Sequence, residues 1–103
     1  MGVISSAIEF IEKLRDDNPA TIKFIKKDGS ERIMKCTLNF NKIPDSDKPK
    51  GVSLKAILNL IRKHKLVHVY DLEKRLWRSV PFDRIEWVTI DNRRFTISNK
   101  GGL

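Results

Sequence analysis

The apolar positions near the start of the chain follow a helical period. They recur three and four residues apart, at Ile4, Ala7, Ile8, Ile11 and Leu14. This spacing predicts an amphipathic helix with one buried stripe. Ser6 and Glu9 have the spacing of a capping box, and Pro19 closes a polar run that ends the helix. We therefore expect an N-terminal helical segment within residues 1–19.

From residue 20 onward the pattern changes to that of strands. Residues 21–25 and 33–38 are rich in β-branched and apolar residues and flank an Asp28–Gly29 turn, so they predict a hairpin. Met34, Cys36 and Leu38 alternate along the second strand, which places all three on one face. Cys36 is therefore expected in the core rather than as a reactive thiol.

A polar loop after residue 38 leads to a second helical pattern at residues 53–65. Ser53 is the expected N-cap, and Lys63 and Lys65 suit the negative end of the helix dipole. The buried stripe consists of Leu54, Ile57, Leu58 and Ile61. Four short extended runs follow, at residues 66–70, 76–80, 85–90 and 95–98.

The order helix, two strands, helix, four strands predicts an α+β, mainly β fold. Short strands joined by tight turns favour a small SH3-like or Sm-like barrel of five to six antiparallel strands, with an N-terminal helix and an inserted amphipathic helix. We expect a single domain over residues 1–103. It divides into the N-terminal helix (1–19), the barrel (20–98, with helix 53–65 inserted) and a flexible tail (99–103).

Composition narrows the functional classes. The chain has 103 residues, one cysteine, two histidines and a formal charge of +8. One cysteine excludes an internal disulfide, and the sparse ligand set argues against a metal site or any cofactor. No apolar run approaches the roughly 20 residues that a membrane helix needs, so we expect a cytoplasmic protein without membrane contact. No nucleophile constellation or glycine-rich phosphate loop is recognisable, which argues against an enzyme.

The positive charge is concentrated in residues 48–65, which contain no acid. The candidate nucleic-acid-binding residues of this block are Lys50, Lys55, Arg62, Lys63 and Lys65. Phosphate contacts from such a basic block would give sequence-independent affinity. The alternative is an ordinary solvated helix face whose last turn complements the dipole.

Two further features bear on binding. Trp77 beside Arg78 is a candidate platform for base stacking, although packing of the ring in the fold is the alternative. A second basic group lies on or beside the first hairpin. It could bind a ligand, or it could prevent edge-to-edge aggregation of the exposed strands. Its members are Lys23, Lys26, Lys27, Arg32 and Lys35.

Two motifs in the chain resemble those of a known family. The first runs through residues 26–30 and continues with Arg32, Met34, Cys36, Thr37, Leu38, Ile43 and Pro44. The second runs through Val67, Val69, residues 71–74, Trp77, Arg78, Ser79 and Ile85. Together they resemble a WYL-like family of small phage and bacterial proteins. The resemblance covers roughly residues 20–90 and implies an Sm-like or SH3-like β-barrel, with no catalytic residue to carry over.

These observations predict a small, basic, non-enzymatic regulatory module that binds nucleic acid, either DNA or RNA, through a cationic face. The alternative is a protein-binding module that docks onto an acidic host protein, because basic charge steers that encounter too. Small-ligand sensing is a third hypothesis, which rests on fold analogy alone. Unpaired strand edges would also allow a homo-oligomer.

Overall fold

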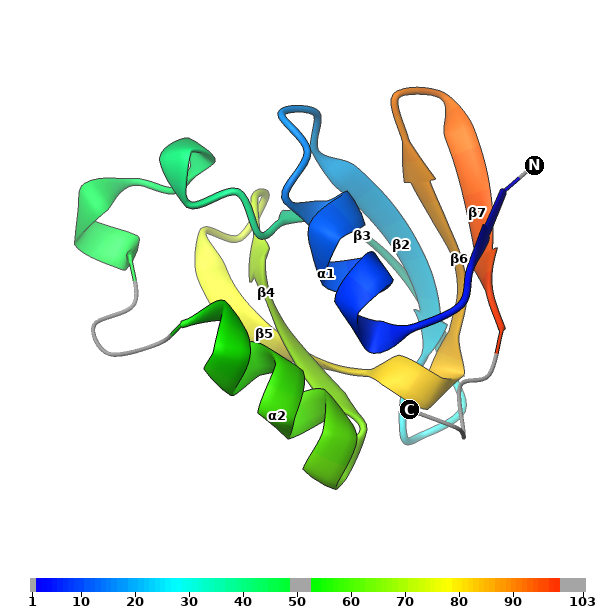
Figure 1. The fold of residues 1–103 in the computed structure, drawn as a ribbon. Coiled ribbons are helices and arrows are strands. Elements are labelled where there is room, and N and C mark those ends of the chain that lie inside the picture. Colours follow the sequence, from blue (N-terminus) through cyan, green and yellow to red (C-terminus); the bar gives the residue numbers. More distant parts are fainter. Residues whose placement is uncertain (1, 49–52, 99–103) are drawn as a thin grey trace.

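The computed structural model describes residues 2–48 and 53–98 and builds them around one β-sheet (Figure 1). Its strands are β1 (Gly2–Ile4), β2 (Ala20–Ile25), β3 (Glu31–Thr37), β4 (Leu66–Asp71), β5 (Leu76–Pro81), β6 (Ile85–Ile90) and β7 (Arg93–Ile97). The α-helices are α1 (Ala7–Leu14) and α2 (Leu54–His64). Three short 3-10 helices complete the described elements, namely η1 (Phe40–Lys42), η2 (Asp45–Asp47) and η3 (Phe82–Arg84). No helix in these ranges is long and apolar enough to span a membrane.

The predicted α+β, mainly β class is confirmed, but the sheet has seven strands instead of five or six. The additional strand is β1, which precedes the first helix and pairs in parallel with β7, Gly2 lying opposite Phe95. All other strand pairs are antiparallel. A strand of three residues is too short to show a period, so the sequence pattern assigned Ile4 to the helix.

The strands are ordered β1-β7-β6-β2-β3-β4-β5 in one curled sheet. Figure 1 shows α1 lying across the sheet and α2 lying beside β4 and β5. β5 is an outer strand, and its only partner among the described strands is β4. β3 pairs with β4 at Cys36 and Thr37 alone, so the first half of β3 diverges from β4. This divergence opens the concave side of the sheet between β3 and β5.

The buried stripe of α1 differs from the predicted one. Phe10 is fully buried and its ring meets that of Phe82 edge to face at 5.1 Å. Ile8, which was predicted to be buried, is 47% exposed. Ala7, Phe10, Ile11 and Leu14 also have three and four residue spacing, and turning this set inward buries the larger aromatic ring.

The helix caps largely follow the sequence prediction. Ser6 Oγ accepts a hydrogen bond from the Glu9 backbone N–H at 3.1 Å, although the Glu9 carboxylate accepts from Ser5 instead of returning to the cap. Ser53 caps α2 in the same way, accepting from the Ala56 N–H at 3.2 Å. The stripe of α2 is confirmed in part: Ile57 and Ile61 are fully buried, whereas Leu54 and Leu58 are half-buried at the edge of the core. The buried residues of both helices pack into the same hydrophobic core as the strands.

Cys36 lies in the core, as predicted, and is fully buried. Burial raises the pKa of its thiol to about 12, and the negative charge of Asp71 adds to this effect. Because the thiolate is the reactive form, we expect Cys36 to resist iodoacetamide at pH 8 in the folded protein. Mass spectrometry should show complete labelling in denaturant and very little without it. Rapid labelling of the native protein would contradict this placement.

Candidate functional site

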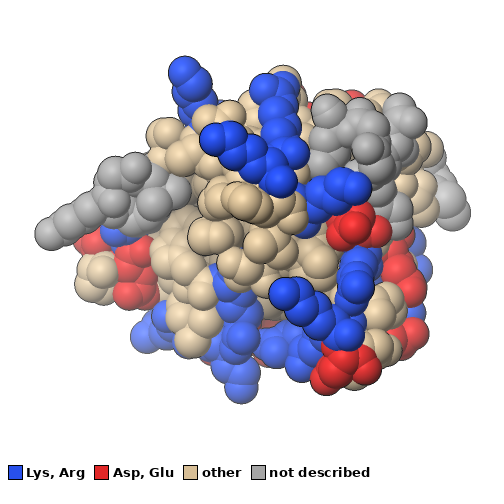
Figure 2. All heavy atoms as spheres, turned by 90° about the horizontal axis from the view of Figure 1, so that it is seen from below, with Lys and Arg blue, Asp and Glu red and all other residues tan. Residues whose placement is uncertain are grey.

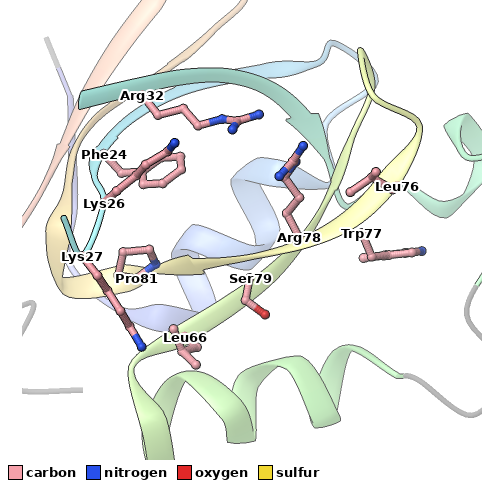
Figure 3. Close-up of a pocket in the computed structure, with 10 residues that line it drawn as sticks. All are labelled: Phe24, Lys26, Lys27, Arg32, Leu66, Leu76, Trp77, Arg78, Ser79 and Pro81. Atoms are coloured by element: carbon pink, nitrogen blue, oxygen red, sulfur yellow. The ribbon is translucent and has the colours of Figure 1, made fainter. Parts of the chain in front are cut away.

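A cationic pocket of about 460 Å³ opens on the concave side of the sheet between β3 and β5 (Figure 3). Its charged lining consists of Lys26, Lys27, Arg32 and Arg78, here called the pocket cations. Its uncharged lining includes Phe24, Leu66, Pro81 and Trp77, whose ring points away from the two arginines in Figure 3. Figure 3 shows the guanidinium groups of Arg32 and Arg78 extending toward each other from the two strands. The pocket therefore combines converging positive charge with apolar surface.

Strand register explains why these two arginines point inward. Arg32 lies opposite Phe24 and is two residues before the buried Met34, so it belongs to the core-facing row of β3. Arg78 lies opposite the buried Val69 and occupies the core-facing row of β5. Each arginine therefore continues a row of core side chains to the point where the strands diverge. There the row ends at the pocket instead of in the core.

A buried carboxylate holds both arginines in place. Asp71 is 1% exposed, and its Oδ2 accepts a hydrogen bond from Arg78 Nε at 2.9 Å. Nη2 of Arg32 lies 3.5 Å from the same oxygen. The other oxygen, Oδ1, accepts the backbone N–H groups of Glu73 and Lys74, both at 2.9 Å. Asp71 thus closes the turn after β4 and also fixes the two arginine side chains.

The charge state of Asp71 follows from these contacts. Burial by itself would raise the pKa of the carboxyl group, but the hydrogen bonds from Lys74, Arg78 and Glu73 outweigh it. The pKa of Asp71 therefore lies below its ordinary value of 3.8. The carboxylate is ionised at neutral pH, which keeps both arginines oriented.

The structure brings two of the predicted site residues, Trp77 and Arg78, into this pocket. Trp77 is half-buried and packs edge-on against Tyr70 and Phe40, with ring centroids 5.7 and 6.3 Å apart. Its indole N–H donates to the Asp47 carbonyl oxygen at 2.8 Å. The Trp77 ring is therefore packed within the fold. This agrees with the alternative that the ring has a structural role and is not a platform for base stacking.

The predicted cations on α2 occupy a separate surface. Lys55, Arg62, Lys63 and Lys65 are all exposed. Leu66 lines the pocket and directly follows Lys65, so the C-terminal end of α2 adjoins the pocket (Figure 3). Lys55 instead borders a smaller groove between α1 and α2. Lys50 lies outside the described residues.

Positive side chains are prominent on the face seen in Figure 2, where lysines and arginines lie on both sides of a strip of uncharged atoms. Not every cation is available to a ligand. Lys23 forms ion pairs with Glu31 at 3.4 Å and Glu86 at 3.2 Å, and these carboxylates raise its pKa. In contrast, the described part of the chain gives the ammonium groups of Lys26 and Lys27 no ion-pair partner.

Sequence reasoning did not assemble this site. The sequence pattern placed Lys26, Lys27 and Arg32 on the first hairpin without linking them to Arg78, and Asp71 appeared within the second family motif and not as a site residue. The sequence did contain a signal for this site: Arg32 is two residues before Met34, so both side chains lie on the same face of the strand. Asp71 is likewise in phase with the apolar residues two and four positions before it. In this protein, charged residues continue the core-facing row of alternate side chains to the point where the sheet opens.

The described residues contain no group of three or more His, Cys, Asp or Glu side chains that could hold a metal ion. The side chains gathered in the pocket are hydrogen-bond donors and apolar groups. Guanidinium and ammonium groups bind anions, and arginine in particular matches the geometry of phosphate or carboxylate oxygens. The site is therefore suited to an anionic ligand.

Residues 7–86 match the model of the family described as WYL_2, Sm-like SH3 beta-barrel fold. The chain belongs to this family. The matched residues of this WYL_2 protein include both helices and every side chain that lines the pocket, whereas β1 and β7 lie outside them. Searches of curated proteins and of solved structures each give no match.

Proposed function

We propose that this WYL_2 protein is a non-enzymatic regulatory module that binds single-stranded nucleic acid. The observation that carries the proposal is the convergence of the pocket cations on one concave site. Four positive side chains line it, and the buried Asp71 contacts only the two arginines among them. Phosphate groups are the anions that nucleic acid presents at regular spacing, so they match such a site.

The uncharged lining favours a single strand over a duplex. Phe24, Leu66 and Pro81 offer apolar surface beside the cations, as proteins that hold unpaired nucleotides do. A duplex is too wide for a pocket of about 460 Å³, whereas ligand pockets of roughly 300–1,000 Å³ hold small organic molecules. The exposed cations on the last turn of α2 extend the basic surface beyond the pocket.

A titration over salt concentration tests this proposal. Fluorescence anisotropy should show binding of labelled single-stranded DNA or RNA at low salt, and weaker binding of the matching duplex. Four phosphate contacts predict a slope of log affinity against log salt of about −3 for a single strand. Polyglutamate of similar charge should compete poorly, because it lacks the sugars and bases that fit the apolar lining.

Other outcomes would contradict the proposal. Absence of binding at low salt, or affinity that does not change with salt, removes nucleic acid as the ligand. Equal competition by polyglutamate would favour the second candidate function, docking onto an acidic protein. The observation that supports this candidate is the groove between α1 and α2, where Ile8 is 47% exposed beside Leu54 and Leu58.

A further inference from the structure

We propose that the pocket holds a terminal phosphate, a phosphomonoester, between Arg32 and Arg78. The proposal rests on the proposed function, because it names the part of the nucleic acid that the site recognises. The same chemical group occurs at the phosphorylated end of a single strand and on a free nucleotide. Both sources are therefore included in the test below.

Asp71 contacts the two arginines through different nitrogen atoms. Arg78 contacts the carboxylate through Nε, at 2.9 Å. Arg32 approaches the same oxygen through Nη2 alone, at 3.5 Å. The described residues give the remaining terminal nitrogens no ion-pair partner. Two oriented guanidinium groups with unused N–H donors form a site for an anion with several oxygens.

The balance of charge in the pocket favours a terminal phosphate. The four pocket cations exceed the single charge of Asp71 by three. A phosphodiester within a strand carries one negative charge, whereas a phosphomonoester carries about 1.5 to 2 at pH 7 and has three terminal oxygens. Both properties favour the terminal group over the internal one at a site with converging arginines.

The shape of the pocket favours the end of a strand over its interior. Arg32 and Arg78 continue rows of buried side chains, with Met34 next along β3 and Val80 next along β5. Phe24, a buried core residue, lines the pocket, so the hydrophobic core closes the pocket beneath the guanidinium groups. A strand bound through an internal phosphate would need room for the chain to continue on both sides of that phosphate. The closed floor leaves room for the chain on one side only, so the end of a strand fits better. The apolar side chains of Phe24 and Pro81 then contact the terminal sugar or base.

Binding of short single strands that differ only at their ends tests the inference. Three internally labelled DNA strands of one sequence carry a 5′-phosphate, a 3′-phosphate or hydroxyl groups at both ends. We expect one phosphorylated strand to bind about tenfold more tightly than the unmodified strand, since charged hydrogen bonds to phosphate are gained. Arg32→Lys keeps the charge but loses the planar fork, so it should remove most of this preference.

Matched variants separate the pocket from general charge. Arg93→Gln removes one exposed charge on β7, which is separated from β3 by β6 and β2 in the sheet, and should keep the preference. Lys27→Gln changes an exposed hairpin residue that lines the pocket and should weaken the preference without affecting folding. Lys27→Gln replaces Arg32→Lys as the test variant if thermal melting shows that Arg32→Lys is unfolded.

The outcomes distinguish this inference from the proposed function. Equal affinity for all three strands would overturn the terminal-phosphate site while leaving nucleic-acid binding intact. Displacement of the phosphorylated strand by a nucleoside monophosphate, but not by the nucleoside, would support the site. Displacement by neither would overturn it. If calorimetry shows that the monophosphate binds and no strand does, the pocket chemistry stands with a free nucleotide as its source, and the proposed function fails.

Discussion

Replacing Asp71 by alanine is expected to lower the free energy of unfolding by about 3 kcal/mol, because the change removes one partner of a buried charge cluster. Asp71 is 1% exposed and accepts from Arg78 and from the Glu73 and Lys74 backbones. Alanine leaves these donors without the acceptor and leaves two arginines facing each other across the pocket. Urea unfolding followed by tryptophan fluorescence measures the loss.

Two further variants at carboxylates separate the role of Asp71 from a general loss of negative charge. Asp71→Asn retains an oxygen that can accept hydrogen bonds from the turn N–H groups. It should therefore lower the free energy of unfolding by less than Asp71→Ala does. Asp83→Ala removes an exposed carboxylate and should change stability by less than about 0.5 kcal/mol. If Asp71→Ala costs no more than Asp83→Ala, the carboxylate does not hold the site together.

The same contacts predict the pH dependence of this effect. The pKa of Asp71 is lowered below 3.8 in the folded protein, because its hydrogen bonds outweigh the effect of burial. A lowered folded pKa adds stability that is complete above the unfolded pKa and is lost as pH falls through the folded value. The difference in stability between wild type and Asp71→Asn should therefore be constant near neutral pH and decrease below about pH 4.

Most of the fold could be predicted from the sequence, because its strands are signalled by local alternation. The pattern Met34, Cys36, Leu38 predicted one buried face, and all three residues are buried. The Asp28–Gly29 turn formed as expected, with Gly29 at a φ of 87°. Such signals lie within a few residues of one another and need no knowledge of distant contacts.

The sequence could not predict features that depend on distant pairing. β1 exists because Gly2 pairs with Phe95, and its close approach leaves no room for a side chain: a Cβ at Gly2 would lie 2.5 Å from the Phe95 ring. The pocket likewise joins Arg32 and Arg78, which are on different hairpins. Local patterns place each residue on a face, but only the register between strands shows that the two faces meet.

The pocket also changes which cations matter most for the proposed function. The sequence pointed to the basic block around α2 because its charge is contiguous along the chain. In the folded protein Lys55, Arg62 and Lys63 project from the exposed face of α2, where each is solvated separately. The pocket cations come from separate segments but converge on one concave surface. Converging charge strengthens the local field, so a phosphate group gains more from the pocket than from the helix face.

A comparison of two triple variants tests this ranking, and we expect the pocket variant to bind a single strand roughly 100-fold more weakly at about 50 mM salt. The pocket variant replaces Lys26, Lys27 and Arg32 by glutamine. Each lost phosphate contact should reduce the steepness of the salt dependence by about 0.7, so the slope should become shallower by about 2. Anisotropy titrations at several salt concentrations measure both quantities.

The matched variant removes the same charge from the helix by replacing Lys55, Arg62 and Lys63 with glutamine. These side chains are exposed, so neither folding nor the pocket should change. If binding depends on the pocket, the helix variant should lose about tenfold or less and keep most of the salt slope, because its contacts are peripheral. Equal losses in both variants would show that net charge alone drives binding. A larger loss of affinity in the helix variant would show that the contiguous basic block indicated by the sequence is the binding interface.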